Sequence, residues 1–509
     1  MVSTQALVAI HAHHHGQVRG ADLSPRSRMF EGRFGRLFRT LPAAEFAPND
    51  LHLLAEAIAA APDETSADDL DAEENSGISA GYTYLGQFID HDLTFDPASS
   101  LQKQNDPEAL VDFRTPRFDL DCLYGRGPAD QPYLYRADGV HMLLGNALTG
   151  ADNDPHARGV PRNQPEPSEP ARALIGDPRN DENIIVSQLH AIFLRFHNKV
   201  VEVLQHGATL PDFAQVQRFV RWHYQWVVLH DFLPTIVLAE VLAEVAPHIG
   251  NHTNIITDPP QLRFYKPKYD AFIPVEFSVA AYRFGHSMVR PDYRLNATTA
   301  QLPIFASTGP SLVGFQAFPT DLAIDWGKFF AMEARPATGA TRLMPAYKID
   351  TSLVNPLKTL PLSVAGDPPL SLAERNLLRG LSMGLPSGQA VAFAMGFEPI
   401  ADADLHVGKA TEEDTPTNPR LTDISPAFTD AAPLWYYIFA EAQQAFEDDT
   451  TPIQLGAVGG RIVAEVFLGL LLEDKHSFLQ QNPLWEPFDQ FRQPDGTFGM
   501  AELIRAAQS

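Results

Sequence analysis

The chain has 509 residues, of which 44% are hydrophobic and 10% aromatic, and its 38 basic and 63 acidic residues give a net charge of −25. This length suffices for one large core or two to three smaller ones, and the acidic balance argues against nucleic acid or an anionic membrane surface as the main partner. A single cysteine, Cys122, excludes a disulfide framework within the chain.

Targeting signals are not recognisable in the sequence. The amino terminus, MVSTQALVAI, lacks the basic region, long apolar stretch and cleavage site of a Sec signal. No run reaches 18 apolar residues, so we expect no membrane span. The compartment stays open between the cytoplasm and export by a leaderless route, and the sequence does not indicate an oligomeric state.

The first 78 residues are predicted to form an N-terminal arm and an acidic loop. Residues 1–60 indicate an arm followed by a short helix. A His-rich tract at residues 11–15 can bind a transition metal, although a mobile or locally packed tail is the better explanation. Residues 61–78 are acidic and poor in bulky apolar groups, which is typical of a solvated loop.

The stretch GQFIDHD, residues 86–92, follows directly. If it is helical, Gln87, Asp90 and His91 stand at i, i+3 and i+4 and share one face. Asp92 is rotated away by about 100° and must serve another purpose. A solvated helix end is the simplest interpretation, but an imidazole between an amide and a carboxylate is an unusual group to place beside Phe88 and Ile89.

Oxygen-bearing side chains alternate in RTPRFDLDCLYG. An extended chain would direct Thr115, Arg117, Asp119 and Asp121 to one side. Such a set suits calcium, which takes 6–8 hard oxygen ligands, but the loop lacks the glycine and the distal glutamate of an EF-hand. From these residues alone, a solvated acidic turn explains the pattern as well as a metal site does.

A long helix is predicted to begin at Asp177-Pro178, with Asp177 as N-cap and proline in the first turn. Apolar residues from 185 to 204 then fall at helical spacing. Arg179 and Glu182 stand at i and i+3, where an intrahelical ion pair of little weight is the simplest explanation. His190 and His197 are best explained as core or capping histidines.

Four further helices complete the prediction of a mainly α fold with long loops and few short strands. Residues 213–245 form a helix interrupted at Pro234, and Pro274 opens another, on which Arg283 and His286 stand at i and i+3. A lone histidine there is more often structural than a ligand. The helix in SLAERNLLRGLSMGLP carries Asn376 and Arg379, and the last strong helix follows Gly456. The chain has no GxGxxG, Walker, HExxH, GxSxG or CxxC motif.

In this order the segments resemble the animal-type haem peroxidases, the superfamily of myeloperoxidase, lactoperoxidase and the cyclooxygenases, and most closely its bacterial members. GQFIDHD is similar to the distal-histidine helix, GDPRNDENIIVSQLHAIFLRFHN to the distal-arginine segment and YRFGHSMVRP to the proximal-histidine segment. NLLRGLSMGLP resembles the segment that supplies its hydrogen-bond partner, and TPRFDLDCLYG the calcium loop. The resemblance implies a single large helical catalytic domain at 79–485, with 486–509 as a C-terminal tail.

The resemblance also implies a peroxidase chemistry on haem b. His286 would bind the haem iron, and Asn376 would accept its other ring N–H. His91 would take a proton from hydrogen peroxide and return it to the departing oxygen, and Arg179 would stabilise the negative charge that develops. Gln87 is placed to hold a water or halide. The ferryl product would oxidise small electron donors.

Further residues take roles from the same resemblance. Asp90 and Glu182 stand where two haem esters form in mammalian relatives. The third link, a methionine sulfonium, is not expected because Asn183 follows Glu182. Bromide, iodide, thiocyanate or phenols are therefore expected as donors before chloride. Arg283 and Arg379 match arginines that meet haem propionates. The set expected around Ca2+ is Asp92, Thr115, Arg117 through its carbonyl, Asp119 and Asp121.

Two alternatives remain. Fatty-acid dioxygenases of the superfamily place a radical-forming tyrosine three residues before the proximal histidine. Here that position holds Arg283, while Tyr282 is four residues before His286. The second alternative is a catalytically inactive, calcium-stabilised adhesion or scaffold protein on the same fold. Retention of His91, Arg179, His286 and Asn376 together argues against it.

Overall fold

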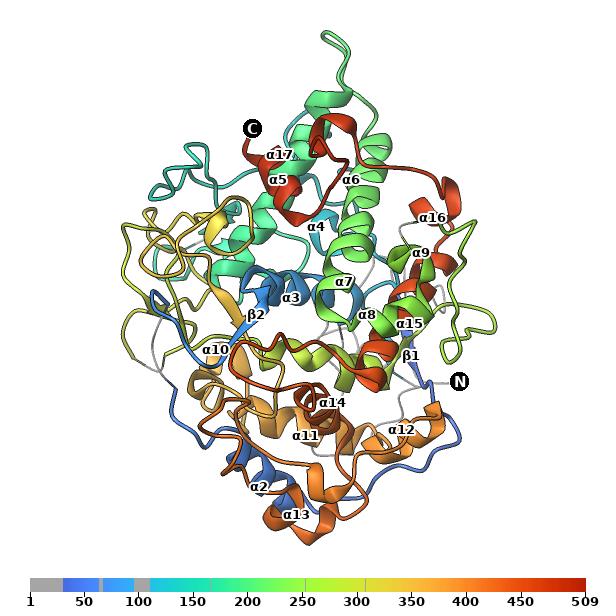
Figure 1. The fold of residues 1–509 in the computed structure, drawn as a ribbon. Helices are drawn as coiled ribbons and strands as arrows, with labels where there is room; N and C mark the ends of the chain where they lie inside the picture. Colours follow the sequence, from blue (N-terminus) through green and yellow to red (C-terminus); the bar gives the residue numbers. More distant parts are fainter. Residues whose placement is uncertain (1–30, 64–66, 96–109, 165, 252, 307) are drawn as a thin grey trace, which may run out of the picture.

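A computed structural model describes residues 31–63, 67–95, 110–164, 166–251, 253–306 and 308–509. The His-rich tract at 11–15 lies outside the described residues. The prediction of a mainly helical fold with few short strands is confirmed, since helices and long loops form most of the described chain (Figure 1). No helix in these ranges is both long enough and apolar enough to cross a bilayer.

Four long helices form the centre: α3 (Gly81–Leu93), α5 (Ile184–Leu204), α6 (Phe213–Val227) and α15 (Ala457–Glu473). In Figure 1, α5 and α6 run through the upper part of the molecule, and α3 lies below them. Phe88 of α3 stacks on Phe193 of α5, with ring centroids 4.5 Å apart, and meets Tyr224 of α6 edge-on. These aromatic pairs anchor α3 at the centre of the core.

A second group of helices, which includes α11, lies below α3 in Figure 1. It comprises α2 (Pro48–Ile58), α11 (Leu372–Ser382), α12 (Gly388–Met395), α13 (Leu421–Ile424) and α14 (Leu434–Gln443). Helix α11 packs against α2 and α14. The remaining helices and turns are α4 (Asp121–Tyr124), η3 (Pro132–Leu134), α8 (Ala239–Val245), α9 (Pro247–Gly250), η8 (Trp326–Lys328), η9 (Asn355–Leu357), α10 (Leu362–Ala365), η10 (Asp402–Asp404), η11 (Pro426–Phe428), α16 (Phe478–Gln481), η12 (Asp489–Phe491) and α17 (Met500–Gln508).

The strands form small sheets that tie distant segments together. One sheet has the order β3-β1-β6, in which β1 pairs antiparallel with β3 and parallel with β6. The other sheets pair β2 with β9, β4 with β5 and β7 with β8. The strands are β1 (Gly32–Gly35), β2 (Glu74–Ser79), β3 (Val111–Asp112), β4 (Arg162–Asn163), β5 (Arg172–Ala173), β6 (Ile273–Pro274), β7 (Asp292–Tyr293), β8 (Leu302–Pro303) and β9 (Pro345–Tyr347).

The helix predicted from Asp177 is divided into two parts. Asp177 does cap the segment, but the first turn is a separate 3-10 turn, η4 (Pro178–Asp181). The α-helix α5 begins after Asn183, whose side-chain oxygen accepts the N–H of Val186. The second N-cap explains the break, because Asn183 takes an extended conformation in order to cap α5.

Two other predicted helices also differ from the structure. Pro234 does not end its helix; the chain passes through a π turn, η5 (Val228–Phe232), into α7 (Leu233–Ile236), where the proline sits in the first turn. The segment after Pro274 is not one α-helix but a π turn, η6 (Glu276–Ala280), followed by a 3-10 turn, η7 (Ala281–His286). The backbone leaves helical geometry at Ala280, which has φ −126° and ψ −75°.

The acidic stretch at 61–78 is not simply a solvated loop. Glu74 is buried and pairs with Arg290 and Arg342, each at 2.6 Å. Glu73 is also buried, and Lys409 donates to it. These partners lie hundreds of positions away in the sequence. The local composition therefore predicts a solvated loop, although Glu73 and Glu74 are buried and paired.

The predicted C-terminal tail, 486–509, ends in a packed helix. Helix α17 packs against α5 and buries Met500, Leu503 and Ile504. The backbone N–H of Met500 donates to Asp231 at 2.6 Å. The tail is thus part of the packed structure that supports α5.

Candidate active site

One cavity is lined by residues of α3, η7, α10 and α11 and of the segments next to them. Both predicted histidines, His91 and His286, are in its wall. The predicted site residues that line it are Gln87, Asp90, His91, Glu182, Arg283 and His286. Much of the rest is apolar, including Ile304, Phe305, Leu357, Leu360 and Val364. A wall with these properties suits a large, mostly apolar cofactor held by few polar groups.

His91 is a buried, neutral base at this wall. Its Nδ1 lies 2.8 Å from Oδ1 of Asn180, which leaves Nε2 as the ring nitrogen available to the cavity. Burial, reinforced by the positive charge of Arg179, lowers the pKa of His91 to about 4. The imidazole is therefore uncharged at neutral pH and can accept a proton.

His286 is the corresponding imidazole of η7. Its Nδ1 lies 2.9 Å from Nδ2 of Asn376 on α11, so the predicted pair is in contact. The prediction had Asn376 accept a ring N–H, whereas the atom that faces the ring is the amide nitrogen. Burial, with a smaller effect of Arg283, lowers the pKa of His286 to about 3. A neutral imidazole is the form that binds haem iron.

Gln87, Glu182 and Asn183 form a hydrogen-bonded chain in the wall. Nδ2 of Asn183 donates to Gln87 Oε1 at 3.1 Å, and Gln87 Nε2 donates to Glu182 Oε2 at 3.1 Å. Burial raises the pKa of Glu182 to about 7, although Arg179 and Arg283 oppose the shift. The amide of Gln87 is therefore held in one orientation by groups on both sides.

Asp90 joins the two faces of the cavity at one edge. Its Oδ1 accepts the hydroxyl of Thr94 at 3.0 Å, and its Oδ2 is 3.8 Å from the guanidinium of Arg283. Since Asp90 is on α3 and Arg283 is on η7, this contact links the elements that carry His91 and His286.

The predicted distal arginine, Arg179, is not among the residues that line the described cavity, and it contacts the backbone of His91. Its guanidinium pairs with Asp177 at 2.7 Å and donates to the backbone carbonyl of His91 at 3.1 Å. Arg114 pairs with the same carboxylate and also donates to His91 O at 3.1 Å. Burial alone would raise the pKa of Asp177, but Arg179 and Arg114 hold it far below its ordinary value.

The second predicted propionate residue, Arg379, does not line the described cavity, whereas Arg375 does. The two are on the same helix, α11, one turn apart. Arg375 donates to the backbone carbonyls of Asp367 and Pro369 at 2.6 and 3.0 Å. Arg375 is thus a cation in the wall that the sequence analysis did not select.

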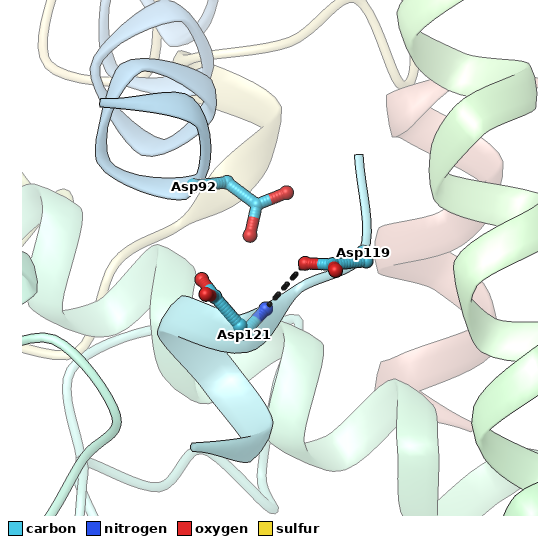
Figure 2. A group of neighbouring side chains, drawn as sticks. All are labelled: Asp92, Asp119 and Asp121. Carbon is cyan, nitrogen blue, oxygen red and sulfur yellow. Dashed lines mark hydrogen bonds between the residues drawn. The ribbon is translucent and has the colours of Figure 1, made fainter. Parts of the chain in front are cut away.

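Three of the predicted calcium ligands gather beside α3. One carboxylate oxygen from each of Asp92, Asp119 and Asp121 lies within 4.8 Å of the others (Figure 2). Thr115 donates its hydroxyl to Asp119 Oδ2 at 2.8 Å. Arg117 has its side chain near Asp474, with Nε 3.8 Å from Oδ1. The rotation of Asp92 away from the face of His91 is thus explained by its position toward this cluster.

The chemistry of the cluster fits a hard cation. Burial and the neighbouring charge of Asp119 raise the pKa of Asp92 to about 7, and burial also raises the pKa of Asp121. Oδ1 of Asp92 and Oδ1 of Asp121 are buried and accept no hydrogen bond from any described residue. The guanidinium of Arg114, 3.5 Å from Asp121, compensates part of this negative charge. A bound cation would stabilise the ionised carboxylates.

Asn180, Arg114 and Arg375 were missed by the sequence analysis. Asn180 and Arg114 each stand next to a selected residue, Arg179 and Thr115, and adjacency was the only signal that pointed to them. Asn180 lies 89 positions from His91, and Arg114 lies 63 positions from Asp177. Contacts between residues so far apart in the sequence produce no periodic pattern from which they could be predicted.

Comparison with known proteins gives one family match and several relatives. The family described as "Animal haem peroxidase" matches residues 99–404, more than half of the chain, in a range that begins after His91. Thyroid peroxidase from Sus scrofa is 29% identical over 304 residues, which cover 55% of this chain and 30% of that protein. Peroxinectin A from Dictyostelium discoideum is 23% identical over 291 residues, covering 55% and 48%. The chain thus spans a third to a half of the length of these relatives.

Solved structures share the fold. Peroxidase A from Dictyostelium discoideum superposes with a TM-score of 0.61 at 16% identity, covering 94% of both chains. A fatty acid alpha-dioxygenase from Oryza sativa superposes with a TM-score of 0.53 at 14% identity, covering 92% of this chain and 78% of the other. Both similarities concern the fold alone.

Proposed function

The chain belongs to the animal haem peroxidase family, and on that premise we propose that it is a haem-dependent peroxidase that reduces hydrogen peroxide and oxidises small donors. The observation that carries the proposal is the presence of two neutral imidazoles, His91 and His286, in the wall of one cavity. Haem b bound there would supply the iron at which the O–O bond breaks and the oxidising equivalents are stored.

His286 is the proposed iron ligand through Nε2, because Nδ1 is already engaged with Asn376. His91 is the proposed base and acid. Its Nε2 would accept a proton from hydrogen peroxide and deliver it to the departing oxygen, so that water leaves. The lowered pKa suits this exchange, since a neutral ring accepts a proton and then readily gives it up.

Arg179 is proposed as the cation that stabilises developing negative charge. Its link to the backbone carbonyl of His91 and its pair with Asp177 keep the guanidinium beside the base. Gln87 is proposed to hold a water or halide, because Glu182 and Asn183 fix its amide at the wall. Removal of the Arg179 guanidinium would cost about 3 kcal/mol of transition-state stabilisation.

Asp90 and Glu182 are proposed to form partial ester links to haem methyl groups, since both carboxyl groups line the cavity. Asn183 cannot supply a sulfonium link. We therefore expect bromide, iodide, thiocyanate or phenols as donors rather than chloride. Arg283 and Arg379 remain the proposed propionate partners, and Arg375 joins them because it is in the wall.

Calcium is proposed as the second cofactor, held by Asp92, Asp119 and Asp121 with Thr115 and the carbonyl of Arg117. The close approach of the three carboxylates and the raised pKa values of Asp92 and Asp121 support it. Because Asp92 is adjacent to His91 on α3, cation binding would help to fix the base.

The dioxygenase alternative has support from the shared fold and from Tyr282, which lines the cavity. Its hydroxyl donates to the carbonyl of Gly86 at 3.3 Å, and Arg283 occupies the position three residues before His286. Oxygen uptake with linoleate, without added peroxide, would favour this alternative. Absence of a Soret band after haem supplementation would favour the inactive-scaffold alternative.

Several finer predictions stay open. The relatives reported above are eukaryotic, so they lend no support to a bacterial-type member. The domain limits of 79–485 also remain a prediction.

An absorption spectrum tests the proposal most directly. The haem-loaded protein should give a ferric Soret band, and stoichiometric hydrogen peroxide should convert it within the mixing time to an oxidised spectrum. His91→Ala should slow this conversion by about 10²–10⁴ while leaving the ferric band in place. Failure to bind haem, or an unchanged rate in the variant, would disprove the assignment.

A further inference from the structure

A single buried amide connects the proposed base to a second histidine. Oδ1 of Asn180 lies 2.8 Å from Nδ1 of His91, and Nδ2 of the same amide lies 3.2 Å from Nδ1 of His190. Asn180 and His190 are fully buried. Asn180 belongs to η4, and its partners His91 and His190 belong to α3 and α5, so the amide and both rings are held by secondary structure.

The chemistry of an amide restricts what these contacts can be. Its oxygen only accepts and its nitrogen only donates, so the two imidazoles must present opposite states at Nδ1. The 2.8 Å contact suits N–H···O, which is the shorter bond, and 3.2 Å suits a longer N–H···N contact. In this orientation His91 carries its proton on Nδ1, and His190 carries its proton on Nε2.

Both rings are neutral, which is the condition under which tautomers matter. Burial lowers the pKa of His91 to about 4 and that of His190 to about 3. A neutral imidazole with the proton on Nε2 would present an N–H to the cavity and could not act as a base there. One with the proton on Nδ1 presents a lone pair.

We infer that Asn180 is a positioning residue that fixes the tautomer of His91, so that Nε2 faces the cavity as a proton acceptor. His190 serves as the second anchor, because its Nδ1 lies 3.2 Å from Nδ2 and holds the other end of the amide. The inference rests on the proposed function, for which a basic Nε2 at His91 is required.

The tautomer can be observed directly. Full-length protein labelled with 15N-histidine is loaded with zinc protoporphyrin IX, a diamagnetic replacement for haem, and long-range 1H–15N correlations are recorded at pH 7. The His91 signals are assigned by their loss in His91→Gln. We expect the pattern of a ring protonated at Nδ1. A ring protonated at Nε2 in the unsubstituted protein would overturn the inference without any other variant.

Substitutions test the cause. Asn180→Leu keeps the shape and removes the acceptor, so the His91 signals should shift toward a mixture of tautomers. Asn180→Asp restores an acceptor and should restore the Nδ1 form. Asn75→Leu is the matched control, because Asn75 is another fully buried asparagine, bonded to Ile453 and outside the cavity wall. It should leave the signals unchanged.

Cyanide binding to the ferric haem protein gives an independent reading. Hydrogen cyanide must lose its proton as cyanide binds the iron, and Nε2 of His91 is the expected acceptor. Association should slow about tenfold in Asn180→Leu, the effect of losing one neutral hydrogen bond, and recover in Asn180→Asp. A normal tautomer and a normal rate in folded Asn180→Leu would overturn the inference. If the protein bound no porphyrin, the proposed function would fail, and the NMR measurement on the unloaded chain would still test Asn180.

Discussion

The amide nitrogen of Asn376 lies 2.9 Å from Nδ1 of His286 and also 2.9 Å from the carbonyl oxygen of Leu372. An NH2 group has two hydrogens and can donate to both acceptors. In this arrangement Nδ1 of His286 is an acceptor, and Nε2 carries the proton. Metal binding at Nε2 requires the opposite tautomer, with Nδ1 protonated and donating. Iron binding at Nε2 would therefore require Nδ1 to carry the proton and the side-chain oxygen of Asn376 to accept it.

Asn376→Asp should shift the reduction potential of the haem iron. A carboxylate accepts from Nδ1–H more strongly than an amide, so it makes the imidazole more basic and favours ferric iron. We expect the potential to fall by about 60 mV, equivalent to a tenfold change for a one-electron couple. Spectroelectrochemical titration measures it. Asn376→Leu removes both acceptor and donor and should move the potential the other way; equal potentials in all three proteins would contradict this role.

Asp177 should be among the most sensitive positions for stability. Its carboxylate is fully buried and compensates Arg114 and Arg179 together. Asp177→Asn leaves two partly buried cations with a neutral partner, which should lower the free energy of unfolding by about 3–5 kcal/mol. Urea unfolding measures the change. Asp130→Asn, which removes the exposed partner of Arg126, is the control and should change stability by less than about 1 kcal/mol.

Calcium should stabilise the protein through the carboxylate cluster. A cation that binds only the folded state adds about 2.7 kcal/mol to the free energy of unfolding when present at a hundredfold excess over its dissociation constant. Isothermal titration calorimetry and urea unfolding with calcium or with EGTA measure affinity and stabilisation. Asp119→Ala should abolish both effects, whereas Asp138→Ala, an exposed-loop carboxylate paired with His141, should retain them. Equal stability with calcium and EGTA would refute the site.

The sequence predicted what depends on local spacing. Helix α3 and the shared face of Gln87, Asp90 and His91 follow from a 3.6-residue period, and the structure brings all three to one cavity. The apolar spacing at 185–204 likewise predicted helix α5, but as a helix that packs by one face. The structure instead buries every residue from Ile184 to Asn198, so α5 is a core helix. The side chain of Asp92 was correctly separated from that face, since it reaches Asp119 and Asp121.

Long-range polar contacts could not be predicted in this way. Glu74 and Arg290 are 216 positions apart, and each looks like an ordinary surface charge within its own segment. The role of Asn180 could not be predicted either, because it depends on the imidazole of His91, 89 positions away. The breaks at Asn183 and Ala280 arise from capping and tertiary packing, which override helical propensity.

A carboxyl group at the start of α15 should make stability depend on pH. Glu441 accepts the backbone N–H groups of Val458 at 2.8 Å and of Gly459 at 3.0 Å. Burial raises the pKa of Glu441 to about 7, although these N–H groups oppose the shift. Because the folded state binds this proton more tightly than the unfolded state, stability is full below the unfolded pKa and is lost as pH rises through about 7.

Glu441→Gln isolates this contribution, because glutamine is nearly isosteric and does not titrate. The difference in the free energy of unfolding, wild type minus variant, should fall by on the order of 3 kcal/mol between pH 4.5 and pH 8. Urea unfolding at several pH values measures it. The dipole of α15 argues the other way, since a helix amino terminus favours an ionised carboxylate. A difference that grows with pH would mean that the dipole and the two N–H groups outweigh burial, so the sign of the slope decides between the two effects.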